Sequence, residues 1–135
     1  MTEQPPPPQR WKKQGARTLA HTRIFDVESV DYQHPARQKP QDFFVISAPD
    51  WVNVVALTPD RQLVRVRQCR FGLNDFSVEI PGGVMDRGEE AVAAGVRELR
   101  EETGYVGTAA RLLGVVHPNP AMQNNLAAGG DLCAA

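Results

Sequence analysis

The stretch 83–105, GVMDRGEEAVAAGVRELREETGY, constrains the fold of this chain more than any other part of the sequence. It follows a Pro-Gly-Gly sequence at 81–83, which predicts a tight turn, and it contains no proline between 89 and 102. Glu, Ala, Arg and Leu dominate 89–102, and these residues favour helix. Gly104 follows as a helix stop signal. The stretch therefore predicts a tight turn followed by one helix.

The predicted helix has one apolar face. Apolar and small polar side chains recur along it at helical spacing, namely Val92, Val96, Leu99 and Thr103. Such a stripe typically packs against a sheet. Glu89 and Glu90 lie in the predicted first turn, where the helix dipole favours negative charge.

A second face of the helix carries three carboxylates. Glu98, Glu101 and Glu102 are spaced i, i+3 and i+4, so they lie on the same side of the helix. Like charges at this spacing cost a few tenths of a kcal/mol per pair, and the C-terminal half of a helix disfavours anions. Arg97 and Arg100 offset part of this repulsion, and a divalent cation such as Mg²⁺ would offset more.

Two interpretations of this face are open on the residues alone. The first is the solvated face of a helix rich in Glu and Arg, which is common. The second is a metal site, and the Pro-Gly-Gly sequence at 81–83 favours it, because glycine lets backbone approach a ligand closely and direct a carbonyl toward the carboxylates.

The same stretch resembles the Nudix hydrolase signature. That signature has Gly, five residues, Glu, seven residues, and then Arg-Glu-apolar-any-Glu-Glu-any-Gly-apolar. The matching positions are Gly83, Glu89, Arg97, Glu98, Leu99, Glu101, Glu102 and Gly104. The last position holds Tyr105, which is bulky but not aliphatic and is a mild departure.

The resemblance implies a site and an activity. The metal ligands it implies are Glu98, Glu102 and the carbonyl of Gly82, with Glu101 as a further ligand or as the base. It implies a catalytic role for Arg97 and Glu89 as a pair that holds the loop against the helix. The implied cofactor is Mg²⁺, with Mn²⁺ as a substitute. The implied reaction is hydrolysis of a nucleoside diphosphate linked to another moiety.

The segments that flank the helix resemble the ADP-ribose and nucleotide-sugar pyrophosphatase branch of the family. Within this resemblance Arg70 and Glu79 are candidate substrate-binding residues. The alternatives are a solvated arginine at a strand end for Arg70, and a metal-assisting or arginine-paired carboxylate for Glu79. ADP-ribose or a nucleotide sugar is the first choice of substrate. An inactive or weakly active fragment, or a nucleotide-binding module without turnover, is the alternative.

Length and composition exclude several classes of protein. With 135 residues and 41% apolar residues, the chain is expected to form one packed domain. A net charge of −1 gives no global field toward nucleic acid or anionic membrane, so neither partner is expected. No apolar run approaches the ~20 residues of a membrane span. The N-terminus lacks the apolar core of a secretory signal, and the two cysteines, Cys69 and Cys133, are not spaced as a metal-binding pair, so a reducing cytoplasm is expected.

The rest of the chain predicts a β-rich domain after a tail. Residues 1–20, with four consecutive prolines, are expected to be a disordered Pro-rich tail, and 21–135 to be the Nudix domain. The apolar pattern predicts a hairpin formed by two of the strands, 51–57 and 63–67. In full, the predicted strands are 22–32, 43–47, 51–57, 63–67, 76–80 and 110–116.

The C-terminal part departs from the family pattern. The run His117-Pro118-Asn119-Pro120 resembles a loop of the nucleotide-sugar branch, after which family members continue with a strand and a helix. Here the last ten residues are rich in Ala and Gly and have no clear strand or helix pattern, and Asp131 is the only acid after Glu102. The expected fold is the α/β/α sandwich of the family around a mixed sheet, truncated at the C-terminus. Thin helical cover predicts an exposed apolar face or a homodimer.

Overall fold

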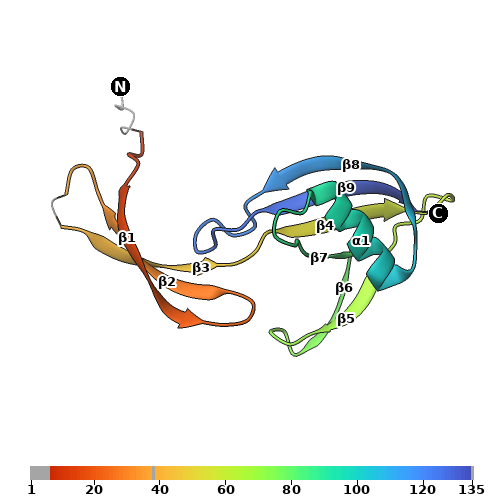
Figure 1. Ribbon diagram of the computed structural model, residues 1–135, viewed down its shortest axis with the longest axis horizontal. Helices are drawn as coiled ribbons and strands as arrows, with labels where there is room; N and C mark the ends of the chain where they lie inside the picture. Colours follow the sequence, from red (N-terminus) through yellow and green to blue (C-terminus); the bar gives the residue numbers. More distant parts are fainter. Residues whose placement is uncertain (1–6, 38, 135) are drawn as a thin grey trace, which may run out of the picture. The chain divides into compact units, whose positions relative to one another are not determined.

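The computed structural model describes residues 7–37 and 39–134, which form strands and one helix (Figure 1). Contacts divide the chain into two compact units: the chain up to Ala48 with Ala121–Asn124, and Pro49–Pro120 with Asn125–Ala135. In chain order the elements are β1 (Lys12–His21), β2 (Asp26–Gln33), β3 (Gln41–Ser47), β4 (Trp51–Leu57), β5 (Val66–Arg70), β6 (Asp75–Glu79), β7 (Gly82–Val84), α1 (Ala91–Thr103), β8 (Gly107–Val116) and β9 (Ala127–Ala134).

The first unit is a three-stranded antiparallel sheet in the order β1-β2-β3. Strand β2 is central, and its Val30 is only 1% exposed. The segment 121–124 joins this unit through Asn124, whose side-chain amide donates a hydrogen bond to Ser47 Oγ at 3.0 Å. The predicted strands 22–32 and 43–47 correspond to β2 and β3.

The expectation of a disordered tail over 1–20 is wrong for residues 12–20, which belong to β1. This strand pairs with β2 from Lys12↔Gln33 to His21↔Asp26. Every position of β1 except Gly15 is exposed, so the strand has no apolar alternation by which its sequence could reveal it. Trp11, just before β1, makes edge-to-face contacts with the rings of His34 and Phe43. Residues 1–6 lie outside the described residues.

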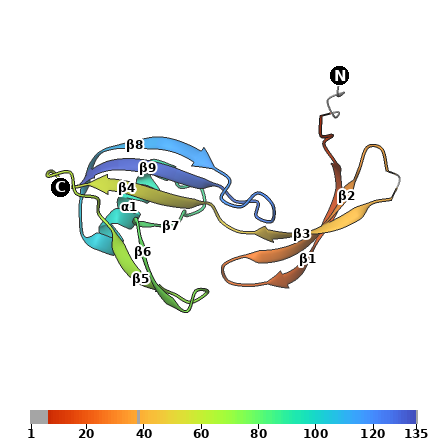
Figure 2. The ribbon, with the colours of Figure 1, turned by 180° about the vertical axis from the view of Figure 1, so that it is seen from behind.

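The second unit contains a four-stranded mixed sheet in the order β7-β4-β9-β8. Strands β4 and β9 are parallel, and the other neighbours are antiparallel. Helix α1 packs on one face, where Val52, Val54 and Ala56 of β4 are at most 1% exposed. The reverse view in Figure 2 shows this sheet in front of α1, with no helix over its other face in the described residues.

Helix α1 contacts the sheet through two small residues and one leucine. A Cβ atom on Gly95 would lie 3.3 Å from Val54 Cγ2, so the helix backbone approaches β4 closely. The buried residues of α1 are Ala94, Gly95 and Leu99. The predicted apolar face is therefore correct at Leu99, whereas Val92 and Val96 are only half-buried.

The ends of the helix differ from the prediction by one or two residues. Glu90 is the N-cap residue and makes no side-chain capping bond, so neither Glu89 nor Glu90 lies inside the first turn. Gly104 ends the helix as predicted. Its φ of 77° is a left-handed conformation that glycine adopts at low cost, and its N–H donates to the Arg100 carbonyl at 2.9 Å.

The predicted hairpin between 51–57 and 63–67 forms only at its turn end. There Leu57 bridges Leu63 in antiparallel register, the Val64 N–H donates to the Ala56 carbonyl, and Val64 packs with Val54 and Ala56. The chain then leaves β4, and β5 pairs with β6 in a separate two-stranded antiparallel sheet. The alternating residues 63–67 thus contact the end of β4 through Leu63 and Val64, and then begin β5 at Val66.

The last described residues form a strand that the sequence did not indicate. Strand β9 pairs with β4 on one side and β8 on the other, and Ala127 and Ala128 are 6% and 5% exposed. Small side chains fit this position because the strand lies beneath α1 and between two neighbours. The second helical layer of the expected sandwich is not present in residues 7–37 and 39–134. Within that part of the chain no helix combines the length and the apolar character that crossing a membrane requires.

Large apolar side chains are exposed in both units, as the thin helical cover predicted. In the first unit they include Ile24, Phe25, Phe43 and Phe44, and in the second Phe71, Leu73, Phe76, Leu113 and Val116. A homodimer that covers part of this surface remains a prediction. Size-exclusion chromatography with light scattering measures it: a dimer is expected, and a monomer that binds no apolar dye would contradict it.

Candidate active site

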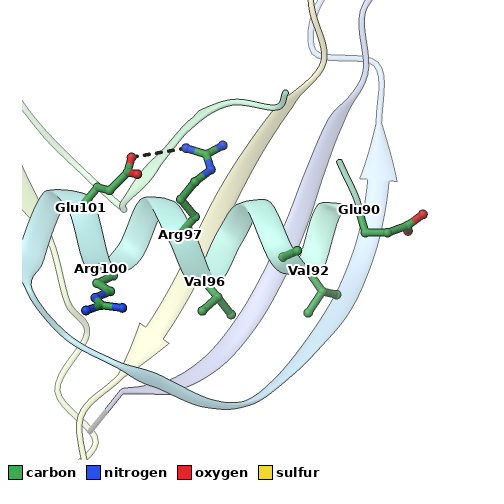
Figure 3. A pocket seen from close by; sticks show the side chains of 7 residues that line it. Glu90, Val92, Val96, Arg97, Arg100 and Glu101 are labelled. Atoms are coloured by element: carbon green, nitrogen blue, oxygen red, sulfur yellow. Dashed lines mark hydrogen bonds and ion pairs between the residues drawn. The ribbon is translucent and has the colours of Figure 1, made fainter. Parts of the chain in front are cut away.

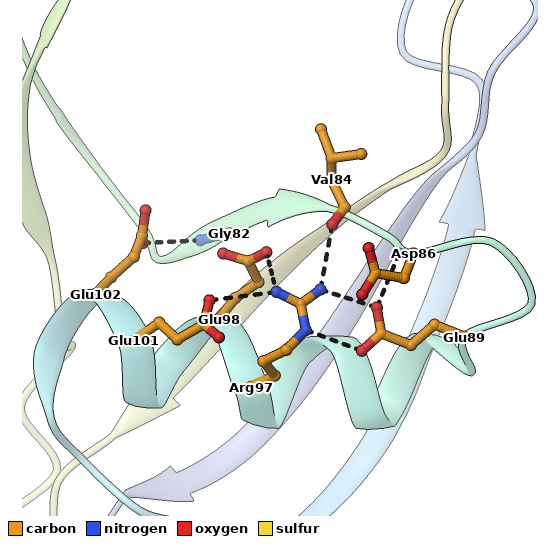
Figure 4. A network of polar contacts seen from close by, with 8 residues as sticks. All are labelled: Gly82, Val84, Asp86, Glu89, Arg97, Glu98, Glu101 and Glu102. Carbon is orange, nitrogen blue, oxygen red and sulfur yellow. Dashed lines mark hydrogen bonds and ion pairs between the residues drawn. The ribbon is translucent and has the colours of Figure 1, made fainter. Parts of the chain in front are cut away.

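Two carboxylates of α1 lie against strand β7 (Figure 4). The N–H of Gly82 donates a hydrogen bond to Glu102 Oε2 at 3.1 Å. A Cβ atom on Gly83 would lie 2.5 Å from the carboxyl carbon and both oxygens of Glu98. The glycines therefore leave the space that the carboxylate of Glu98 occupies.

The sequence predicted a tight turn at the Pro-Gly-Gly residues 81–83. The structure has no free turn there. Residues 82–84 are the short strand β7, whose Gly82 pairs with Asn53 of β4. A Cβ on Gly82 would collide with the carbonyl oxygen of Val52 and would lie 2.9 Å from Asn53 Oδ1. Close strand pairing on one side and a carboxylate on the other explain why both positions are glycine.

Gly83→Ala is expected to displace the Glu98 carboxylate with little loss of stability, because the end of a glutamate side chain can move. Changes around metal ligands typically cost 10–100-fold in metal affinity. We therefore expect the Mg²⁺ concentration for half-maximal thermal stabilisation to rise at least about tenfold. In the control variant Gly72→Ala, nothing lies within 4 Å of the added Cβ. Equal metal responses of the two variants would contradict the prediction.

Arg97 links the helix to the loop before it (Figure 4). Its Nε and Nη2 donate to Glu89 Oε1 and Oε2 at 3.0 and 2.8 Å, a bidentate ion pair. Its Nη2 also donates to the Val84 carbonyl at 3.2 Å, and its Nη1 donates to Glu98 Oε1 at 2.7 Å. The Arg97–Glu89 contact expected from the family resemblance is thus present, and the same guanidinium orients Glu98.

This network perturbs the titration of its members. The Arg97 guanidinium, and next the N–H of Asp86, lower the pKa of Glu89 from 4.5 to about 2. Glu89, followed by Glu98, raises the pKa of Arg97. Both groups are charged throughout the neutral range, so the contact is an ion pair under working conditions.

Acid is expected to weaken this pair within a defined window. A carboxyl group with a lowered folded-state pKa stabilises the fold above its unfolded-state value near 4.5, and this contribution is lost as pH falls toward about 2. The melting temperature of the wild type should therefore fall more steeply between pH 4.5 and 2 than that of Glu89→Gln. Thermal melts with chelator present measure both slopes, and parallel slopes would contradict the prediction.

The donor set suits a hard divalent cation. Glu98 and Glu102 present oxygen atoms beside the β7 backbone, and Mg²⁺ prefers carboxylate and carbonyl oxygens. Glu101 is 59% exposed and accepts a longer bond from Arg97 Nη1 at 3.3 Å. In the described residues no three His, Cys, Asp or Glu side chains converge as a metal-binding group. Figure 4 shows that Arg97 contacts Glu98 and Glu101 and that the Gly82 N–H contacts Glu102.

An open hollow lies along α1 (Figure 3). Its volume is about 890 Å³. The lining residues are Glu90, Val92, Ala93, Val96, Arg97, Arg100 and Glu101. Arg97 and Glu101 belong both to this hollow and to the carboxylate network, whereas Glu98, Glu102 and the β7 glycines do not line it.

Arg70 and Glu79 contact each other on the β5–β6 sheet. Arg70 Nε donates to Glu79 Oε1 at 2.9 Å and to Oε2 at 3.2 Å, and its Nη2 also donates to Oε2. Gln68 Nε2 donates to Glu79 Oε2 at 3.4 Å. Of the alternatives for Glu79, the structure therefore contains the one in which Glu79 pairs with an arginine.

The remaining candidates lie away from the carboxylates or are engaged elsewhere. Asp131, the last acid of the chain, forms an ion pair with Arg111 at 3.0 Å. His117 is exposed in the loop after β8. The sequence did not indicate the contacts of the Val84 carbonyl and the Asp86 N–H, because backbone groups carry no signal in residue type.

The chain resembles known proteins over its second unit and part of its first. Residues 47–126 match the NUDIX domain. An ADP-ribose pyrophosphatase of Bacillus subtilis is 34% identical over 96 residues, covering 66% of this chain and 50% of that protein. An ADP-sugar pyrophosphatase of Mus musculus is 37% identical over 62 residues, covering 46% of this chain and 28% of that protein. This chain thus spans about half the length of the Bacillus protein, and less of the mouse protein.

A solved structure supports the fold. The crystal structure of an ADP compounds hydrolase superposes with a TM-score of 0.82 at 23% identity, covering 94% of this chain and 69% of that one. The fold of the described residues is therefore the Nudix fold, with mixed strand directions and α1 beside the carboxylate site. Because the NUDIX match extends over more than half of the sequence, the chain belongs to the Nudix family.

Proposed function

We propose that this protein is a divalent-metal-dependent pyrophosphohydrolase that cleaves the diphosphate of a nucleoside diphosphate linked to another moiety. The observation that carries the proposal is the placement of the Glu98 and Glu102 carboxylates against the Gly82–Gly83 backbone. Family membership supports it, because the matched positions of the domain include these glutamates.

ADP-ribose or an ADP-sugar is the proposed substrate class. The support is the similarity to an ADP-ribose pyrophosphatase and an ADP-sugar pyrophosphatase, at 34% and 37% identity. The carboxylate site recognises metal and diphosphate, so selection of the base and the sugar depends on other residues.

The proposed metal ligands are Glu98, Glu102 and the carbonyl of Gly82, with Mg²⁺ as the first candidate and Mn²⁺ as a substitute. When bound, the cation would neutralise diphosphate charge and lower the pKa of a bound water. Arg97 holds Glu98 by a 2.7 Å bond and is itself fixed by Glu89. This pair keeps the Glu98 carboxylate in place before any ligand arrives.

Glu101 is the proposed base. Its side chain is 59% exposed, whereas that of Glu98 is 13% exposed, and its bond from Arg97 Nη1 is 3.3 Å long. A carboxylate in this condition can approach a water molecule and accept its proton. The other assignment, a further metal ligand, predicts that Glu101→Gln weakens metal binding, whereas a base predicts unchanged metal binding and slower turnover.

A nucleotide-binding module without turnover is the second candidate. It is favoured by one observation: in the described residues, no three His, Cys, Asp or Glu side chains converge as a metal-binding group. Both candidate functions predict nucleotide binding, but only the hydrolase predicts turnover.

The discriminating experiment measures phosphate release, coupled through a phosphatase. The panel is ADP-ribose, nucleotide sugars, dinucleoside polyphosphates and nucleoside triphosphates, each with Mg²⁺ and with chelator. Metal-dependent turnover of ADP-ribose or an ADP-sugar is the expected result. No turnover from protein that binds ADP with Mg²⁺ would support the binding module instead.

A further inference from the structure

One end of the β1–β2–β3 sheet in the first unit is both basic and aromatic. The register Lys12↔Gln33 and Lys13↔Tyr32 places the start of β1 beside the end of β2, and the loop that connects β2 to β3 begins at the same end. This region, the basic end, contains the cationic side chains of Arg10, Lys12, Lys13, Arg37 and Lys39.

The cations of the basic end have no carboxylate partner in the described part of the chain. All five residues are exposed, and within residues 7–37 and 39–134 none of them forms an ion pair. The sequence has no Asp or Glu between residues 4 and 25. The net charge of −1 for the whole chain conceals this local excess of positive charge, which attracts polyanions.

An aromatic cluster lies at the same end of the sheet. The Trp11 ring makes edge-to-face contacts with His34, at 4.8 Å between ring centres, and with Phe43, at 5.5 Å. Tyr32 contacts Phe43 in the same way at 5.9 Å. Phe43 is 44% exposed, and the other three residues are half-buried. The cluster therefore presents ring surface to solvent among the free cations.

Two open hollows combine these rings with the cations. The first has a volume of about 670 Å³ and is lined by Arg10, Trp11, Lys12, Lys13 and Tyr32. The second has a volume of about 580 Å³ and is lined by Lys12, Gln33, His34, Pro35, Ala36 and Arg37. Lys12 belongs to both hollows, so they adjoin and offer one continuous surface to a ligand.

The loop that carries Arg37 is fixed by its own polar groups. The Ala36 N–H donates to His34 Nδ1 at 3.0 Å, and the Arg37 N–H donates to the His34 carbonyl at 3.2 Å. The side-chain amide of Gln33 donates to the Arg37 carbonyl. A loop that is ordered in advance loses less freedom when a ligand binds.

The nearest acids in the β2–β3 register lie on the opposite face of the sheet from the cluster. Asp31 pairs with Asp42, and Tyr32 pairs with Gln41 at the next position. Because successive residues of a strand point to opposite faces, these two carboxylates lie on the face away from Tyr32. The face with the aromatic cluster is therefore the one that suits an anion.

We propose that the basic end binds single-stranded nucleic acid. Exposed Lys and Arg side chains neutralise its phosphates, and its bases stack on the aromatic cluster, a combination that suits a single strand with accessible base faces. An acidic peptide would use the cations and leave the rings without a partner. The basic end shares no residue with the carboxylate site of α1, so this inference goes beyond the proposed function and does not depend on it.

Fluorescence anisotropy of a labelled oligothymidylate of about 12 nucleotides tests the proposal with the whole chain. We expect binding that weakens roughly 100-fold between about 50 and 200 mM salt, because five neutralised phosphates give a log–log salt slope near −3.5. Inorganic polyphosphate of the same charge carries no bases and should bind at least about tenfold more weakly.

Two matched double variants test the cations. Lys12→Gln with Lys13→Gln should make the salt slope shallower by about 1.4, since each phosphate contact contributes about 0.7. Arg17→Gln with Arg23→Gln removes the same charge from the middle of β1 and from the turn after it, so its slope should equal that of the wild type. Equal slopes of the two double variants would overturn the proposal.

Two variants of Trp11 test the rings. Trp11→Leu keeps an apolar side chain against His34 and Phe43 but loses the flat ring, and it should bind the oligonucleotide roughly tenfold more weakly at an unchanged salt slope. Trp11→Phe keeps a ring and should stay within about threefold of the wild type. The lysine variants change exposed side chains, so the proposal stays testable if Trp11→Leu does not fold.

Three further outcomes would overturn the proposal. The first is wild-type affinity in Trp11→Leu, and the second is polyphosphate binding as tight as that of the oligonucleotide. The third is no binding by the wild type at up to about 100 μM protein, the weak limit of non-specific binding.

Competition with ADP and Mg²⁺ separates this surface from the proposed active site. An excess of ADP with Mg²⁺ should leave the oligonucleotide bound, and Glu102→Gln should bind it as the wild type does. Displacement by ADP, or loss of binding in Glu102→Gln, would place the oligonucleotide at the carboxylates and overturn the separate surface. Oligonucleotide binding without any turnover of ADP-ribose would leave this inference standing and count against the proposed function.

Discussion

Glu102→Gln is expected to lower metal-dependent hydrolysis of the preferred substrate by roughly 10²–10³-fold, since a metal ion supplies several kcal/mol of transition-state stabilisation and each ~1.4 kcal/mol is tenfold in rate. The amide can still accept the Gly82 N–H bond, which is 3.1 Å long in the wild type. The variant therefore removes the charge with little change in local structure. Phosphate release with Mg²⁺ and with chelator measures the effect.

The matched control for this prediction is Glu90→Gln. Glu90 carries the same side chain, lies at the start of the same helix, and makes no capping bond. We expect its activity to equal that of the wild type. If Glu102→Gln kept more than about a third of the activity, or if Glu90→Gln lost as much, the metal role of Glu102 would be wrong.

Leu99→Ala is expected to destabilise the fold by about 2–5 kcal/mol, the usual cost of a large-to-small change in a core. Leu99 is 0% exposed and, with Leu132, is one of the two largest fully buried side chains of the described residues. It belongs to the cluster formed by Val54, Ala56, Val64 and Leu132, which joins α1 to β4 and β9. Urea unfolding followed by circular dichroism measures the free energy of unfolding.

An exposed leucine gives the comparison for this variant. Leu73 is 63% exposed in the turn between β5 and β6, so Leu73→Ala should change the free energy of unfolding by less than about 0.5 kcal/mol. The two substitutions remove the same atoms, one set from a buried helix position and the other from an exposed turn. Equal losses of stability would mean that Leu99 does not form the core contact described above.

The carboxylate site could be predicted from sequence because its information is local. The spacing i, i+3 and i+4 places Glu98, Glu101 and Glu102 on one side of any α-helix. The helix itself is predicted by the composition of residues 89–102. Strand β4, residues 51–57, was also predicted with its observed bounds, because its β-branched residues are buried. These features depend on near neighbours in the chain.

The missed features depend on partners that are distant in sequence. Strand β1 is almost wholly exposed, so its pairing with β2 leaves no apolar pattern. Strand β9 contains Ala and Gly, which have low strand propensity, and its burial depends on β4, β8 and α1. The use of Gly82 and Gly83 as an edge strand, and not as a turn, likewise depends on register with β4.

The Arg70–Glu79 contact shows a further limit of sequence reasoning. Both residues were selected as substrate-binding candidates by resemblance, and the structure brings them together as an ion pair. Two residues nine positions apart meet only because β5 and β6 form an antiparallel pair. The resemblance selected both residues, whereas their pairing with each other depends on the register of the two strands.

The parallel pairing of β4 with β9 has a consequence for how the second unit folds. The N–H of Leu126 bonds to Asp50 across 76 residues at the start of this pair. Non-local contacts of this kind form late in folding, because closing the long loop costs conformational entropy before the contact stabilises the chain. Until β9 is in place, the apolar undersides of α1 and β4 are open to other chains. We therefore expect refolding of this protein to be slow and its yield to fall as protein concentration rises.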